Sequence, residues 1–352
     1  MRVLNKYDIA VQFFQGFNAQ GPGAGDIQFS ALPEKTKRWW VSYVVARLAP
    51  FANLGGYQYA WESAGNDTNT ATKDPQSCGH WEGNGTARHW QGSRCGDYQL
   101  AELLSEMDVF RHMTTYEEMN ATTKNHFDLP AWSFASVEAL GEGDARLCGG
   151  THPKNVTCNA SGVQNHHDVS LQGYRGKPVY MCEGHNLWRS WWQAQEKNVV
   201  RAAWAVTTAA ASFTWSDLGH APDDPYISTQ AYTTYPAAAK ALDVHHEIMT
   251  KEVAAFYRMV PADELLLFPA PPLTFCLAEP GAQYVVYSDA GLPFFLDLTT
   301  RAASNSTFSL TWFEAATGKK TVGGSVAGGS PRLRPPSEGK HWVALLLRQH
   351  SR

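Results

Sequence analysis

The sequence predicts an α/β protein: a (β/α)8 TIM-type barrel that lacks its first two strands, followed by a C-terminal all-β sandwich. Strand-like and helix-like segments alternate from the start of the chain to about residue 260. Such alternation, with buried strands, indicates a parallel sheet covered by helices. From residue 273 onward the chain changes to short alternating runs separated by turn residues, which is typical of a sandwich.

The barrel elements follow one another in a regular order. We expect strands at 9–14, 53–62, 130–139, 167–174, 177–184 and 211–217. We expect helices at 34–49, 97–113, 188–204 and 231–256. Because a closed barrel needs about eight strands, the two absent strands and a signal peptide are expected before Met1.

The second domain is expected to start close to the segment "FPAPP", residues 268–272, which has the composition of a linker. The predicted domains are therefore residues 1–262 and residues 263–352. Within the second domain, "WFEAATGKK" is typical of a hairpin with glycine at its turn.

Composition narrows the classes of function. The net charge of −4 lacks the basic footprint of a nucleic-acid-binding protein. No apolar run reaches the roughly 18 residues of a membrane-spanning helix. The 13 tryptophans exceed ordinary usage, and tryptophans at strand ends can stack on sugar rings, although most tryptophans are core residues.

Several features indicate an extracellular protein of the secretory pathway. Cys78 and Cys95 flank one polar loop and Cys148 and Cys158 flank another, so both pairs are predicted to form local disulfides. Cys182 and Cys276 lie in apolar surroundings and could be paired or be buried thiols. The chain also carries six N-x-[ST] glycosylation motifs, at Asn66, Asn84, Asn120, Asn155, Asn159 and Asn305.

Two glutamates follow predicted strands at positions that suggest catalysis. Glu62 ends the fourth strand and Glu183, in "VYMCEGHNLW", ends the seventh, if the two upstream strands are counted. A lone glutamate at a strand end usually points into water. A pair across a barrel mouth, however, can serve as acid/base and nucleophile of a retaining glycosidase, whose carboxyl groups lie about 5–5.5 Å apart.

The segments "RWWVSYVVARLAPFANLGGYQYAWE", "HDVSLQGY", "KPVYMCEGHNLWR" and "RAAWAVTTAAASFTWSD" together resemble the apiosidase-like barrel glycoside hydrolases. The tail "CLAEPGAQYVVYSDAGLPFFLDLT…FSLTWFEAATGKK" is similar to the C-terminal domain of that family, which is named for collagen binding. The resemblance implies Glu62 as acid/base and Glu183 as nucleophile. The sequence departs from the wider superfamily at Trp61, where asparagine is usual, and at Gln172, where histidine is frequent.

Other strand-end residues are candidates for substrate binding. Glu138 could bind sugar hydroxyls or replace Glu62 as the acid. His166 and His167 resemble a pair of metal ligands. Neighbouring residues of a strand point to opposite faces, however, so a solvated or capping role is favoured for them. No metal site and no cofactor are predicted. The remaining candidates, each either facing sugar or part of the core, are Trp61, Gln172, Tyr174, His185, Trp188 and Trp215.

Two hypotheses about function follow. The first is a secreted retaining glycoside hydrolase that acts on an oligo- or polysaccharide. The second is a non-catalytic extracellular glycoprotein, a carbohydrate-binding or structural module built on a glycosidase fold, with a partner in an extracellular matrix or cell wall. Trp61, Gln172 and the heavy glycosylation favour the second. The distance between the two carboxyl groups would distinguish them.

Overall fold

The computed structural model describes the chain in segments that form two compact units. Unit 1 comprises residues 1–138 and 175–180, and unit 2 comprises residues 139–174 and 181–352. The described residues are 6, 11–19, 33–61, 102–115, 117–118, 133–137, 164, 167–168, 170–171, 177–186, 196–216, 236–299 and 304–349.

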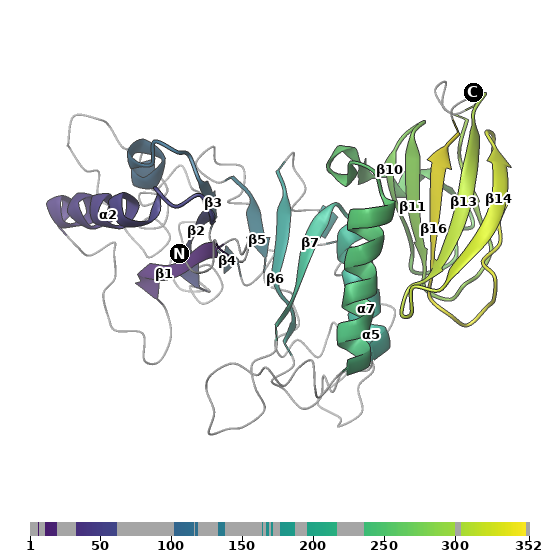
Figure 1. Ribbon diagram of the computed structural model, residues 1–352, viewed down its shortest axis with the longest axis horizontal. Coiled ribbons are helices and arrows are strands. Elements are labelled where there is room, and N and C mark those ends of the chain that lie inside the picture. The colour runs from purple at the N-terminus through teal and green to yellow at the C-terminus, as the bar shows by residue number, and fades with distance from the viewer. Residues whose placement is uncertain are drawn as a thin grey trace. The chain divides into compact units, whose positions relative to one another are not determined.

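Unit 1 contains a parallel β-α-β arrangement at its start (Figure 1). Strand β1 (Val11–Ala19) leads to helix α2 (Glu34–Leu48), and the chain returns as strand β2 (Leu54–Trp61), parallel to β1. Proline at the helix start, Glu34 in the first turn and Arg47 in the last turn suit a helix and its dipole. The buried positions of α2 have helical spacing: Lys37, Val41, Val44 and Val45.

The prediction of a helix at 97–113 is wrong at the C-terminal end of this range. Helical structure in the described part covers 102–107 and stops before Asp108. The Asp108 carboxylate accepts hydrogen bonds from the backbone N–H groups of Phe110 (3.1 Å) and His112 (2.8 Å), so it stabilises a turn instead of another helical turn. Strand β3 (Met113–Thr115) then pairs in parallel with β2, in a sheet of order β1-β2-β3.

Four further strands of the α/β region form a separate sheet. β4 (Glu117–Glu118) pairs in parallel with β5 (Ala135–Val137), and Ala135 donates its N–H to Pro178 O at 2.9 Å, immediately before β6 (Val179–Asn186). β6 in turn is the sheet neighbour of β7 (Ala211–Ser216). The described strands of the α/β region therefore make two sheets and not one closed barrel.

The strand expected at 167–174 is a second error, because residues 167–168 and 170–171 are helical. His167 and Ser170 are the buried positions, three residues apart, and Gln164 Nε2 donates to Asp168 Oδ1 at 2.9 Å across a spacing of four. Both spacings belong to a helix. The predicted series of strands thus included one whose described residues are helical, and it omitted β3 and β4.

The helices before the sandwich also differ from expectation at their ends. α5 (Glu196–Thr208) continues to Thr208, four residues beyond the expected end at 204. α7 (Pro236–Glu247) passes into a π-helical turn at Ile248–Glu252, and Val253 leaves the helix in an extended conformation. The helix predicted to reach residue 256 therefore stops at about 252.

The C-terminal region of unit 2 is antiparallel, as the sequence predicts. A six-stranded sheet has the order β14-β13-β16-β11-β10-β8, and a three-stranded sheet has the order β15-β12-β9. Figure 1 shows β14, β13, β16, β11 and β10 of the larger sheet side by side. The turn of the predicted "WFEAATGKK" hairpin joins β13 to β14, with Gly318 at φ +73° and its N–H bonded to Glu314 O at 2.8 Å. The strands are β8 (Val260–Pro261), β9 (Leu266–Leu267), β10 (Thr274–Glu279), β11 (Gln283–Ser288), β12 (Phe294–Leu296), β13 (Thr307–Glu314), β14 (Lys320–Ala327), β15 (Arg332–Leu333) and β16 (Trp342–Arg348).

Both faces of the central strands β10, β11 and β16 of the six-stranded sheet are buried. Along β10, Phe275 and Leu277 belong to one apolar cluster, whereas Cys276 and Ala278 belong to another. The first cluster contains α5 and α7 residues such as Trp204, and the second contains residues of the three-stranded sheet. The central strands are therefore continuous apolar runs without polar alternation. The predicted boundary between residues 262 and 263 stays a prediction.

Candidate active site

Glu183 lies within strand β6, which extends to Asn186 and therefore two residues beyond the predicted end at 184. The buried residues Val179 (1% exposed) and Met181 (0%) anchor the first half of the strand in the core. His185 lies in the same strand, nearer its C-terminal end. In parallel α/β sheets ligands bind at the carboxyl ends of the strands, so Glu183 and His185 stay candidates for a binding or catalytic role.

Two other predicted residues also lie at or near the carboxyl ends of strands. Trp61 is the last residue of β2. Trp215 lies one residue before the end of β7. β2 belongs to unit 1, whereas β7 and the carboxyl end of β6 belong to unit 2.

The partner carboxylate falls outside the described residues. Glu62 and Glu138 directly follow the last described residues of β2 and β5, and neither is itself described. Their roles and their distances from Glu183 therefore stay predictions. Three further substrate-binding candidates also fall outside the described residues, namely Gln172, Tyr174 and Trp188.

Strands β3 and β4 were not predicted from the sequence, and β4 adds two more glutamates to the sheet that contains β6. Glu117 and Glu118 form β4, beside β5. The Thr115 hydroxyl donates to Phe134 O at 2.8 Å, next to the start of β5. A signal was present in "MTTYEE", where threonines and a tyrosine favour a strand over the end of a helix.

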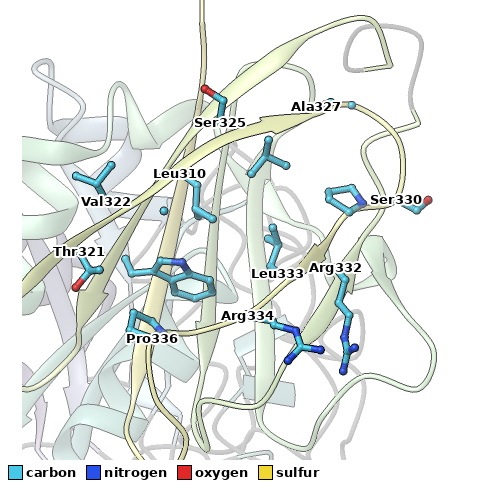
Figure 2. A pocket seen from close by; sticks show the side chains of 15 residues that line it. Leu310, Thr321, Val322, Ser325, Ala327, Ser330, Arg332, Leu333, Arg334 and Pro336 are labelled. Atoms are coloured by element: carbon cyan, nitrogen blue, oxygen red, sulfur yellow. The ribbon is translucent and has the colours of Figure 1, made fainter.

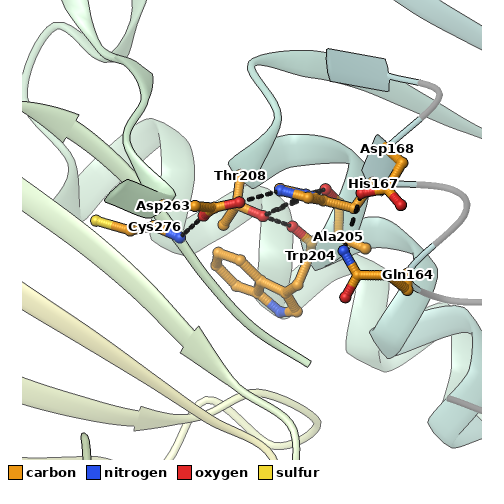
Figure 3. A network of polar contacts seen from close by, with 8 residues as sticks. All are labelled: Gln164, His167, Asp168, Trp204, Ala205, Thr208, Asp263 and Cys276. Carbon is orange, nitrogen blue, oxygen red and sulfur yellow. Dashed lines mark hydrogen bonds and ion pairs between the residues drawn. The ribbon is translucent and has the colours of Figure 1, made fainter. Parts of the chain in front are cut away.

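A buried cluster in unit 2 has the outline of a catalytic triad, as Figure 3 shows. His167 Nε2 lies 2.6 Å from Asp263 Oδ2, and Thr208 Oγ1 lies 3.5 Å from His167 Nδ1. However, His167 Nδ1 faces Ala205 O at 2.6 Å and must donate there, while the Thr208 hydroxyl donates to Trp204 O at 2.7 Å. The hydroxyl is thus not activated, and His167 is 0% exposed.

The His167 cluster is therefore structural. His167 stacks on Phe275 with ring centroids 4.0 Å apart, and Asp263 Oδ1 accepts the Cys276 N–H at 2.6 Å. These contacts connect His167 with Asp263 and with β10 of the sandwich. Within the described part of the chain, no group of three or more histidines, cysteines or carboxylates could hold a metal ion.

Cys276 is a free, buried thiol, one of the two alternatives that its apolar surroundings left open. Burial, with the nearby Asp263 and Glu264 carboxylates, raises the pKa of this thiol well above its ordinary value, so it is unreactive. Cys182 lies in β6. The cysteines of both predicted disulfides, Cys78, Cys95, Cys148 and Cys158, lie outside the described residues.

One glycosylation motif can be located. Asn305 is exposed in the turn that precedes β13. Asn66, Asn84, Asn120, Asn155 and Asn159 lie outside the described residues. No described helix combines the length and the apolar character needed to cross a bilayer.

Comparison with known proteins places the fold among glycoside hydrolases. One solved structure, "Glycoside hydrolase", matches with a TM-score of 0.63 and 14% identity, over 93% of this chain and 72% of that chain. A glycoside hydrolase family 5 structure from Bacteroides vulgatus matches with a TM-score of 0.62 and 15% identity, over 91% of this chain and 68% of that one.

A third structure, a glycoside hydrolase from the same organism, has a TM-score of 0.57 and 13% identity, over 98% of this chain and 61% of that one. No protein-family model matches the sequence. No curated protein matches it either. The chain therefore has a glycoside-hydrolase-like fold, and at these identities the likeness concerns the fold alone.

Proposed function

We propose that this protein is a retaining glycoside hydrolase in which Glu183 is the nucleophile and Glu62 the acid/base. The observation that carries the proposal is the position of Glu183 near the carboxyl end of β6, in a chain whose fold matches glycoside hydrolases over 93% of its length. Glu62, directly after the last residue of β2, would be the partner. Both positions agree with the rule that barrel enzymes place their chemistry at strand ends.

The chemistry divides between the two carboxyl groups. Glu183 attacks the anomeric carbon, while Glu62 protonates the leaving oxygen and then activates the water that releases the sugar. Glu138 and His185 would bind sugar hydroxyls, and Trp61, Trp188 and Trp215 would stack on sugar rings. We include in the same proposal that the protein is a member of the apiosidase-like family of glycoside hydrolases.

Substitution of Glu183 tests the proposal. In the full-length natural protein, Glu183→Gln should abolish hydrolysis of aryl glycosides, whereas Glu62→Gln should lower it less for substrates with good leaving groups, because these need little protonation. Glu338→Gln, at an exposed loop position, is the matched control and should leave the rate unchanged. Equal rates in the Glu183→Gln variant and the natural protein would disprove the role of Glu183.

One observation favours the second candidate, a non-catalytic carbohydrate-binding module. Helix α2 carries an exposed aromatic stack in which Trp39 (62% exposed) lies 5.7 Å from Tyr43 (45%) and Arg47 lies 5.2 Å above the Tyr43 ring. Exposed flat rings of this kind can bind sugar faces. If the natural protein bound polysaccharide without hydrolysing it, and Trp39→Ala weakened that binding, this candidate would replace the first.

Secretion belongs to the proposal as well. The six glycosylation motifs and the spacing of the cysteines support an extracellular protein with disulfides Cys78–Cys95 and Cys148–Cys158. Mass mapping of protein secreted from eukaryotic cells should find both disulfides and several glycans, including one at Asn305. Four free thiols and no glycan would contradict the assignment.

A further inference from the structure

A groove of about 810 Å³ opens at one side of the sandwich, between the edge strands of its two sheets. β14 is the edge of the six-stranded sheet and β15 is the edge of the three-stranded sheet. Residues of both strands line the groove (Figure 2). The volume is within the usual range of ligand pockets, about 300–1,000 Å³.

The groove has an apolar floor. Leu310, Trp312, Val326 and Leu333 line it, and all four are core residues with exposed fractions of 2–8%. A ligand that lies in the groove would therefore contact core side chains that lie between the two sheets. Each apolar side chain that it placed there would gain hydrophobic burial.

The wall formed by β14 is a free strand edge. β14 pairs with β13 alone, so the backbone groups on its other side have no partner strand among the described residues. Such edges are usually protected by charged side chains. β14 contains a single charge, Lys320, and that charge is already paired with Glu252 at 2.8 Å.

The opposite wall is basic. Arg332 and Arg334 both line the groove and are exposed, and Leu333 between them is buried. Arg332 lies 5.9 Å above the Phe295 ring, and within the described part of the chain neither arginine has a carboxylate partner. Two unpaired guanidinium groups beside an apolar floor favour a ligand that carries carboxylates.

We propose that this groove binds a short extended peptide with acidic side chains, which adds as a strand to the free edge of β14. Strand addition uses main-chain hydrogen bonds for affinity and places alternate side chains on opposite sides. One set of side chains would pack on the floor at Val326 and Leu333, and carboxylates would meet Arg332 and Arg334. This binding function is independent of the glycosidase proposal.

The β-bulge in β14 limits where the peptide pairs. Thr311 pairs with Val322 and Leu310 pairs with Gly324, so Gly323 has no opposite residue. A Cβ atom at Gly323 would lie 2.6 Å from Leu310 Cγ, which means that the bulge packs tightly on the floor. The regular edge available to a partner is therefore the segment 324–327, and the added strand is short.

Binding of synthetic peptides to the full chain tests the proposal. The probe is a fluorescent eight-residue peptide that alternates valine and aspartate, compared by anisotropy with a peptide in which lysine replaces aspartate. The acidic peptide should bind and the basic one should not. Arg332→Glu combined with Arg334→Glu should weaken binding at least tenfold, while Arg348→Glu, an exposed arginine outside the groove, should leave it unchanged.

Two N-methylated versions of the acidic peptide separate strand addition from charge attraction. In an added strand, alternate amides face β14, so methylation of one alternating set should weaken binding at least tenfold and methylation of the other set should not. Equal binding of both versions would overturn the proposal. The proposal would also be overturned if no peptide bound. That result would stand even if polygalacturonate, an acidic glycan, bound and needed Arg332 and Arg334, because the groove would then bind an acidic sugar and not a peptide.

Discussion

At the scale of single residues, Asp289 connects helix α5 with the sandwich. Its carboxylate accepts two hydrogen bonds from Arg201, at 2.6 and 2.7 Å, and one from the Tyr287 hydroxyl at 3.0 Å. His341 Nδ1 lies 3.0 Å from the same carboxylate. Burial would raise the pKa of Asp289, but the hydrogen bonds and charges of His341 and Arg201 lower it to about 2.

Replacement of this carboxylate should therefore destabilise unit 2. Asp289→Asn removes the negative charge that pairs with the Arg201 guanidinium, and we expect a loss of about 3 kcal/mol in the free energy of unfolding. Glu247→Gln is the control, because its ion pair with Lys251 is exposed and contributes little. Denaturant titration of both variants is the measurement, and equal stabilities would contradict the prediction.

The low pKa of Asp289 also determines the pH range in which its carboxylate stabilises unit 2. Because the folded-state pKa lies below the unfolded value of about 3.9, the stabilisation is complete above pH 4 and is lost as the pH falls towards 2. The Asp289→Asn variant should therefore approach the stability of the natural chain in this acid range. A stability difference that stayed constant down to pH 2 would show that the carboxylate is not the source.

His245 gives a pH dependence in a different range. Burial, and secondarily the charge of His246, lowers the pKa of His245 to about 4. The ring lies 4.7 Å from the Trp204 ring, and its Nε2 lies 2.8 Å from the Thr207 hydroxyl oxygen. The folded state therefore favours the neutral imidazole, which stabilises the fold above the unfolded pKa of about 6.5.

Stability should consequently fall as the pH decreases from about 6.5 to 4, by at most about 3 kcal/mol. His245→Gln keeps a polar group near Thr207 but does not titrate, so its melting temperature should change less over this range. The exposed His246→Gln variant should retain most of the dependence. A His245→Gln variant with the full pH dependence would contradict the prediction.

At the scale of elements, the sequence predicted best where local pattern and tertiary burial agree. The predicted start of α2 at residue 34 is confirmed, and the β13–β14 hairpin was visible from the glycine at its turn. The segment 167–174 failed because its alternation of apolar and polar residues mimics a strand, whereas burial of His167 and Ser170 selects a helix. The π-helical turn at Ile248–Glu252 has no local sequence signature.

The candidate site was predictable only in part, for a related reason. Strand periodicity located β6 and therefore Glu183, because Val179 and Met181 form an apolar run before it. It could not locate β3, a three-residue strand whose position depends on the close approach of Gly56 in the neighbouring strand. The strand-favouring residues of "MTTYEE" are a weak signal, because a strand of three residues is too short to show a period of two.

That close approach gives an element-scale prediction. A Cβ atom at Gly56 would lie 2.6 Å from Met113 O, a backbone atom of β3 that cannot rotate away. Gly56→Ala should therefore separate β2 from β3 and destabilise unit 1 by about 1–3 kcal/mol. Hydrogen exchange at the amides of 113–115 should accelerate in the variant, and unchanged protection there would contradict the predicted close packing.

At the scale of the whole molecule, the sandwich does not bury its own outer face. Phe275, Leu277, Val285 and Tyr287 belong to the same apolar cluster as α5 and α7, and the Trp204 and Tyr287 rings stack with centroids 6.2 Å apart. The helices that an alternating α/β sequence assigns to a barrel thus also form the second layer of the C-terminal sheet. Sequence periodicity records that a face is apolar, but it does not record which element covers it.

A fragment that starts at the predicted domain boundary should for this reason be less stable and prone to aggregation. Residues 263–352 alone would expose the face that α5 and α7 cover, and exposed apolar patches larger than a few hundred Å² cause association. We expect this fragment to bind a hydrophobic dye and to aggregate, whereas residues 196–352, which include both helices, should remain monomeric. Sedimentation and dye fluorescence would compare the two fragments. A soluble 263–352 fragment with native-like stability would show that the α5–α7 layer is dispensable and that the sandwich is an independent domain.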